Sequence, residues 1–139
     1  MGNDEGNDKK KRVVFVTVGT TCFDALVRAV DSNNVKQALF AKGYTHLLIQ
    51  MGRGSYLPTK SEGDGSLAVD YFTFSSSIAD HLRSASLVIS HAGSGSIFET
   101  LQLGKPLIVV VNEDLMDNHQ SDATPVAKHI NNLLGFPDD

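Results

Sequence analysis

The chain has 139 residues, of which 41% are hydrophobic, and this length is sufficient for one hydrophobic core and too short for two. Its formal net charge of -4 argues against a nucleic-acid-binding domain, which normally presents a basic face. The single cysteine, Cys22, excludes an internal disulfide and a zinc cluster of cysteines, so a cytosolic protein is the default expectation.

The first twelve residues are polar and mixed in charge, so we expect a disordered charged leader over 1–12 and one folded domain over 13–139. The leader lacks the apolar stretch of a signal peptide, and no later stretch approaches the roughly 20 apolar residues of a membrane span. The basic run Lys9–Arg12 is typical of a solvated arm, and contact with anionic lipid is the less favoured alternative.

Strand and helix patterns then alternate along the chain. Runs of apolar and β-branched residues predict five strands, over 13–18, 46–50, 69–74, 87–90 and 107–111. Apolar residues at helical spacing predict helices between 23 and 41, over 77–85, from 96 to 103 and, after Thr124 as N-cap and Pro125 as first residue, up to 134. The polar segment 52–66 predicts a surface loop that could act as a flap.

This alternation predicts an α/β fold, a Rossmann-like parallel sheet with helices on both faces. In the common strand order 3-2-1-4-5, the first and fourth strands are neighbours and their carboxyl ends face one crevice. The order brings the turn Gly19–Thr21 beside the turn His91–Gly95, and it places Lys9–Arg12 at the opposite edge. Two turns far apart in sequence would then form one ligand cleft.

The passage from the fourth strand into the next helix is the most informative stretch of the chain. It consists of a histidine and small residues: His91, Ala92, Gly93, Ser94, Gly95 and Ser96. Such a turn leaves backbone N–H groups unpaired at the positive end of a helix, which predicts a site for a phosphate-bearing ligand. The alternative is an ordinary helix start, in which Ser96 caps the helix and Glu99 completes a capping box.

Two side chains at this turn could carry chemistry. Glu99 lies one turn inside the helix, where it could accept hydrogen bonds from ribose hydroxyls or serve the cap alone. His91 is a weak candidate for a catalytic base because no partner is evident, and it could instead contact phosphate or cap the loop. A serine hydrolase is disfavoured, since Ala92 and Ser94 occupy positions where a nucleophile elbow needs glycine.

The segment Asp117–Gln120 follows the fifth strand and opens toward the same crevice. Its amides could bind the edge of a base or sugar hydroxyls, or Asp117 and Gln120 could serve only as a cap. Asp114, Asp117 and His119 form an unconvincing metal-ligand group, so we expect no catalytic metal.

Several stretches in order resemble one family. They are Phe15–Asp24 (FVTVGTTCFD), Gln50–Gly54 (QMGRG), Val88–Ser96 (VISHAGSGS) with Glu99–Thr100, Gly104–Leu107 (GKPL) and Asn112–Gln120 (NEDLMDNHQ). The chain resembles the small cytosolic catalytic subunits of the eukaryotic transferase that adds the second N-acetylglucosamine to the dolichol-diphosphate-linked sugar in N-glycan assembly. The resemblance covers about residues 13–120.

The resemblance implies a glycosyltransferase family 28 enzyme of the GT-B class, divided between chains, in which this chain is the nucleotide-sugar-binding half. It implies UDP-N-acetylglucosamine as the donor, inverting transfer without a metal or other cofactor, and a membrane-anchored acceptor-binding subunit that recruits the chain to the cytosolic face of the endoplasmic reticulum. The donor-binding residues carried over by motif are Gly19, Thr20, Thr21, His91, Ala92, Gly93, Ser94, Gly95, Ser96, Glu99, Asn118, His119 and Gln120.

One stretch departs from the family's pattern. After Gln120 the family continues with an unbroken helix, whereas Ser121–Val126 introduces Pro125, which cannot continue a helix begun at Asn118. A form that binds nucleotide sugar without catalysing transfer, as a regulatory module, is therefore the alternative function. A generic flavodoxin-like or phosphohydrolase domain is a weaker alternative, because no Asp nucleophile or metal triad follows the first strand.

Overall fold

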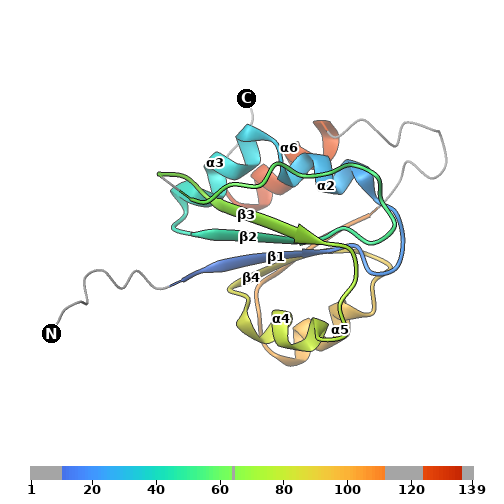
Figure 1. Cartoon of the computed structure of the whole chain (residues 1–139). Helices are drawn as coiled ribbons and strands as arrows, with labels where there is room; N and C mark the ends of the chain where they lie inside the picture. Colours follow the sequence, from blue (N-terminus) through green and yellow to red (C-terminus); the bar gives the residue numbers. More distant parts are fainter. Residues whose placement is uncertain (1–10, 64, 112–123, 136–139) are drawn as a thin grey trace, which may run out of the picture.

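The structure, a computed structural model, describes residues 11–63, 65–111 and 124–135 (Figure 1). Within these residues, five parallel strands form one sheet in the order β3-β2-β1-β4-β5, which confirms the predicted order. The strands are β1 (Val13–Thr17), β2 (His46–Gln50), β3 (Ala68–Phe72), β4 (Leu87–His91) and β5 (Leu107–Val110).

Helices cover both faces of the sheet, as Figure 1 shows. On one face lie α2 (Asp24–Val30), α3 (Asn33–Ala41) and α6 (Thr124–Leu133), which contact one another. On the other face lie α4 (Ile78–Ser84) and α5 (Ser96–Gln102). Parallel strands joined by helical crossovers are buried on both faces, which explains why the strands read as nearly continuous apolar runs.

The alternation of side chains along β1 divides the core between the two faces. Val14 and Val16 are fully buried in the cluster that includes α2, α3 and Ile130 of α6. Phe15, between them, points to the other face and packs with Leu82 of α4. Because successive strand residues point to opposite faces, one strand anchors both helical layers and holds its carboxyl-terminal turn in place.

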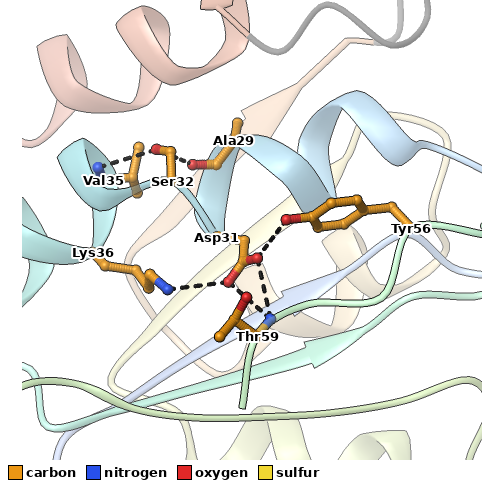
Figure 2. Close-up of polar contacts among 7 residues, drawn as sticks. All are labelled: Ala29, Asp31, Ser32, Val35, Lys36, Tyr56 and Thr59. Carbon is orange, nitrogen blue, oxygen red and sulfur yellow. Dashed lines mark hydrogen bonds and ion pairs between the residues drawn. The ribbon is translucent and has the colours of Figure 1, made fainter. Parts of the chain in front are cut away.

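The loop after β2 is hydrogen-bonded to α2 and to Asp31, the residue that follows this helix. Figure 2 shows the Asp31 carboxylate at the end of α2 accepting hydrogen bonds from the Tyr56 hydroxyl at 2.6 Å and from the Thr59 N–H. Lys36 of α3 pairs with the same carboxylate at 3.2 Å. Closer to β2, Asp24 accepts bonds from Ser55 and from the Tyr56 N–H. Segment 52–66 is therefore a surface loop, as predicted, with contacts to α2 that a movement as a flap would have to break.

Element ends differ from the sequence-based expectation by one or two residues. The third strand ends at Phe72 rather than at Phe74, whose side chain is 53% exposed. Arg12, assigned above to the disordered leader, belongs to the folded domain: its guanidinium stacks on Tyr44 and donates to the Lys42 carbonyl. Residues 1–10 lie outside the described residues.

The pattern on the last two helices also differs in detail. Phe98 and Leu101 of α5 are 68% and 60% exposed, although their spacing is that of a core-facing helix. On α6, Ile130 is buried as its spacing predicts, whereas Leu133 is 54% exposed. No helix in the described part of the chain is long and apolar enough to cross a membrane.

Candidate functional site

The turns after β1 and β4 meet at the carboxyl edge of the sheet, as the strand order predicts. β1 and β4 are hydrogen-bonded neighbours, with Thr17 opposite Ser90. A Cβ placed on Gly19 would lie 3.5 Å from Ser94 Oγ, which is ordinary van der Waals distance, so the two turns lie side by side with room for no more than a methyl group between them. Gly19 has a φ of 71°, a left-handed conformation that glycine adopts without strain. The predicted juxtaposition of Gly19–Thr21 with the Ser94 turn is therefore confirmed.

A buried side chain from β2 fixes the first turn. Gln50 is 2% exposed, and its Oε1 accepts from the Gly19 N–H at 3.0 Å while its Nε2 donates to the Gly19 carbonyl at 2.8 Å. The same amide bonds Thr17 Oγ1 and the Thr73 carbonyl. Each polar atom of this amide has a partner, as a buried amide requires. Both main-chain polar groups of Gly19 are thus held by one side chain.

The segment Gly52–Gly54 braces the same turn from the side away from β4. A Cβ on Gly52 would collide with the Thr21 carbonyl oxygen, and one on Gly54 would collide with Asp24 Oδ1. The Arg53 N–H donates to the Thr21 carbonyl at 3.0 Å, and its guanidinium Nε donates to the Thr20 carbonyl at 3.1 Å. Two small residues therefore allow the main chain to approach closely, and Arg53 lies against the turn.

The second turn begins α5 in a way that the sequence did not predict. The N-cap is Gly95, and it is Ser94, not Ser96, that supplies a hydroxyl: Ser94 Oγ accepts from the Ser96 N–H at 3.1 Å. The capping box of Ser96 and Glu99 is therefore wrong. Among the described residues, the N–H groups of Gly93 and Gly95 have no acceptor, and Ala92, Gly93 and Gly95 are exposed. They remain as donors for a ligand.

His91 lies beneath the second turn. Its ring packs edge-on against Phe23, with 5.3 Å between centroids, and a Cβ on Gly93 would lie 3.0 Å from its Cε1. Nδ1 is buried without a partner in the described part of the chain, and burial lowers the pKa of the imidazole. A neutral ring with no carboxylate to orient it lacks the relay of a general base. The geometry favours a packing role.

The remaining predicted residues fall into three groups. Thr20 is exposed at the first turn, whereas the Thr21 hydroxyl is occupied by the Val18 carbonyl at 3.0 Å. Glu99 is half-buried on α5, and its carboxylate makes no hydrogen bond or ion pair within the described residues. With the capping role removed, ribose binding is the remaining hypothesis for this carboxylate.

Three predicted donor-binding residues, Asn118, His119 and Gln120, lie outside the described residues, as do Asp114 and Asp117. The structure therefore does not test their roles or their alternative capping role. Within 11–63, 65–111 and 124–135, no group of three or more His, Cys, Asp and Glu side chains is arranged to hold a metal ion. The expectation of a metal-free reaction stays a prediction.

A groove of about 720 Å³ lies elsewhere, at the amino ends of β1, β2 and β3. Its walls mix two cations, Lys11 and Lys60, with two anions, Glu62 and Asp70, and Lys60 pairs with Asp70 at 3.4 Å. This lining offers no net positive surface to a phosphate. The carboxyl edge, where the N–H groups of Gly93 and Gly95 have no acceptor among the described residues, remains the better candidate site.

Two residues at the site, Gln50 and Arg53, received no role from the sequence patterns. A polar residue directly after the apolar run Leu47–Ile49 was the available signal for Gln50, because a buried amide at a strand end needs partners. For Arg53, the flanking glycines signalled a close main-chain approach, but not to which segment.

Comparisons with known proteins show the family to which the chain belongs. The model of the glycosyltransferase family 28 C-terminal domain matches residues 13–133. A mouse protein named UDP-N-acetylglucosamine transferase subunit ALG13 is 51% identical over 106 residues, which are 76% of this chain and 9% of the mouse protein. The subunit of the same name from Saccharomyces cerevisiae is 35% identical over 142 residues, with 81% of this chain and 70% of the yeast protein covered.

Among solved structures, the NMR structure of ALG13 matches with a TM-score of 0.61 and 36% identity, and covers 80% of this chain and 71% of that chain. The chain spans 9% and 10% of the mouse and human relatives, so the matched domain is a small part of those proteins. The shared fold is Rossmann-like, as predicted. With the family model matched over 13–133 and the two turns joined at the sheet's carboxyl edge, this chain belongs to the glycosyltransferase family 28 C-terminal domains and is ALG13-like.

Proposed function

We propose that this chain is the donor-binding subunit of a heteromeric N-acetylglucosaminyltransferase that binds UDP-N-acetylglucosamine. The observation that carries the proposal is the close approach of the Gly19 and Ser94 turns at one edge of the sheet, where the N–H groups of Gly93 and Gly95 have no acceptor among the described residues. In open α/β sheets, ligands bind at this switch point. The relatives named UDP-N-acetylglucosamine transferase subunits supply the identity of the donor.

In this proposal the diphosphate lies over the two turns, where the N–H groups of Gly93 and Gly95 stabilise the negative charge that develops on the departing UDP. Glu99 accepts hydrogen bonds from the ribose hydroxyls. Asn118, His119 and Gln120, which follow the fifth strand in sequence, contact the donor sugar or phosphate.

The reaction is an inverting displacement. A hydroxyl of the acceptor N-acetylglucosamine, linked through a diphosphate to dolichol, forms a bond to the anomeric carbon of the donor sugar. The bond between this carbon and the diphosphate oxygen breaks, and UDP leaves with the electron pair. The acceptor proton passes to a base that we assign to the partner half, because His91 is half-buried, its Nδ1 is inaccessible, and no carboxylate among the described residues orients its ring.

The partner is a membrane-anchored subunit that binds the acceptor and recruits this chain to the cytosolic face of the endoplasmic reticulum. The word "subunit" in the names of the relatives supports a heteromer, and the divided GT-B architecture implied by the resemblance supports an acceptor half on another chain. Catalysis is then expected only when both halves are present, without a metal or other cofactor.

The proposal is tested in two stages. UDP-N-acetylglucosamine should raise the melting temperature of the chain, because a ligand that binds only the folded state stabilises it. UDP-glucose, as the weaker ligand in this proposal, should raise the melting temperature less. Transfer to a lipid-diphosphate-linked N-acetylglucosamine should then appear on addition of the membrane subunit. Absence of binding by every uridine nucleotide would refute the proposal, and binding without transfer beside the partner would support the non-catalytic alternative.

A further inference from the structure

Arg53 is placed against the first turn of the candidate site by an unusually close approach of main chain to main chain. A Cβ on Gly52 would lie 2.9 Å from the Gly19 carbonyl oxygen and closer still to that of Thr21. The φ of Gly52 is 59°, which is left-handed. Together with the bond from the Arg53 N–H to the Thr21 carbonyl, these features fix the backbone from which the side chain extends.

The guanidinium is only partly used by the protein. Nε donates to the Thr20 carbonyl at 3.1 Å, and within the described residues the Nη1 and Nη2 groups have no acceptor. Arg53 is exposed, so these donors face solvent at the carboxyl edge. The nearby carboxylate of Asp24 is already bound by Ser55 and Tyr56, and it forms no ion pair with Arg53.

Other cations whose contacts the structure describes are directed to different partners. These are Arg12 on Tyr44, Arg28 on Tyr56, Lys36 on Asp31, Lys60 on Asp70, Arg83 on Asp80 and Lys105 on the Arg83 carbonyl. Arg53 differs because it combines unpaired donors with a position on the turn of the candidate cleft. A planar guanidinium matches the geometry of phosphate oxygens and keeps its charge at all relevant pH values.

We infer that Arg53 is a substrate-binding residue whose guanidinium contacts a diphosphate from the β2 side of the Gly19–Thr21 turn. The inference rests on the proposed function, and it adds a cationic side chain to the N–H groups of Gly93 and Gly95 that are proposed to contact the diphosphate. Two substrates of the proposed reaction contain a diphosphate, the nucleotide sugar and the lipid-linked acceptor. The bond to the Thr20 carbonyl restricts the rotamers of Arg53. The guanidinium therefore loses less conformational entropy when it binds the diphosphate of the donor or of the acceptor.

The experiment compares wild type, Arg53→Gln, Arg53→Lys and the control Arg83→Gln, whose guanidinium is exposed on α4 and paired with Asp80. Calorimetry with uridine, UMP, UDP and UDP-N-acetylglucosamine separates phosphate contacts from other contacts. For a contact to the donor, Arg53→Gln should weaken UDP and UDP-N-acetylglucosamine by about tenfold and leave uridine unchanged. The affinity of Arg53→Lys for UDP should lie between those of wild type and Arg53→Gln, because lysine keeps the positive charge and lacks the planar pair of N–H donors of a guanidinium.

A second arm measures transfer with the membrane subunit present. If Arg53 contacts the acceptor, donor affinity stays at the wild-type value in Arg53→Gln while KM for the lipid-diphosphate acceptor rises by about tenfold. A purely structural role would weaken uridine as much as UDP and would overturn the inference, as would unchanged donor affinity together with unchanged acceptor KM. Wild-type protein that binds no uridine nucleotide would instead refute the proposed function, and the inference with it.

Discussion

Gln50 and Gly19 are joined by two hydrogen bonds in opposite directions, one to each main-chain polar group of the glycine. Oε1 of Gln50 accepts from the Gly19 N–H at 3.0 Å, and Nε2 donates to the Gly19 carbonyl at 2.8 Å. The pairing resembles one rung of a β-ladder made by a side chain. The two bonds hold the main chain of Gly19, in the turn that follows β1, against the end of β2, and the candidate site begins at this turn.

Gln50→Glu tests this relationship with little change of shape. The carboxylate can still accept from Gly19, but it cannot donate to the carbonyls of Gly19 and Thr73, which it would face at hydrogen-bonding distance. We expect a loss of about 1–3 kcal/mol in the free energy of unfolding by urea titration, together with weaker donor binding. Gln37→Glu, at an exposed position of α3, is the control and should change stability by less than about 0.5 kcal/mol.

The close approach of Gly52 to the first turn predicts a second effect. Gly52→Ala places a methyl group against the Thr21 carbonyl, whereas Gly65→Ala meets nothing within 4 Å. Both glycines have a left-handed φ, 59° and 73°, so the backbone cost is similar and cancels in the comparison. Thermal unfolding should show Gly52→Ala to be less stable than Gly65→Ala by about 1–3 kcal/mol. Equal stability of the two variants would contradict the packing described here.

The role of Glu99 can be separated from helix stability, because its carboxylate has no hydrogen bond within the described residues. Glu99→Ala should weaken UDP by about tenfold in calorimetry and change the free energy of unfolding by less than about 0.5 kcal/mol. Wild-type protein should show a similar loss with 2′-deoxy-UDP if the 2′-hydroxyl is the partner. Glu62→Ala, on the exposed loop, serves as control and should leave UDP binding unchanged.

The hydrogen bond between Tyr56 and Asp31 predicts that the free energy of unfolding decreases at alkaline pH. The hydrogen bond to the Asp31 carboxylate, together with burial, raises the pKa of Tyr56 to about 12 from its ordinary value of 10.0. The folded protein keeps this proton where the unfolded chain loses it, so the contribution is complete below pH 10 and is lost as pH rises toward 12. Wild type should therefore lose stability more steeply than Tyr56→Phe over that interval in urea titrations.

At pH 8, Tyr56→Phe should be less stable than wild type by about 2 kcal/mol, because the change removes a hydrogen bond to a carboxylate. Tyr44→Phe is the matched control: the Tyr44 ring lies under Arg12, and its hydroxyl has no partner in the part of the chain that the structure describes. Parallel pH profiles for wild type and Tyr56→Phe would show that the bond between Tyr56 and Asp31 does not form in solution.

Much of the fold follows from local patterns. The run His46–Gln50 was predicted as a strand with the observed bounds, and strands alternating with helices predicted the order that joins the turns of Gly19 and Ser94. Periodicity and connection rules suffice there, because each depends only on neighbouring residues and on the handedness of crossovers.

What the sequence did not reveal depends on contacts across the fold. Nothing local distinguishes Ser94 from Ser96 as the residue that receives the first N–H of α5, since the outcome depends on how Gly95 turns the chain. The roles of Gln50 and Arg53 require knowledge of which loop lies 31 or 33 residues away. Likewise, the sequence did not reveal that Asp24 and Asp31, at the two ends of α2, would bind the loop, so whether segment 52–66 acts as a flap stays a prediction.

The central claim is that a uridine diphosphate sugar binds where the Gly19 and Ser94 turns meet, and amide NMR of the ¹⁵N-labelled chain tests it most directly. Titration with UDP-N-acetylglucosamine should shift the amides of Thr20, Gly93 and Gly95, and those of Lys11 and His46 at the opposite edge should stay in place. If saturating donor leaves the two turns unperturbed, or moves the resonances at the amino ends of the strands instead, the account is contradicted.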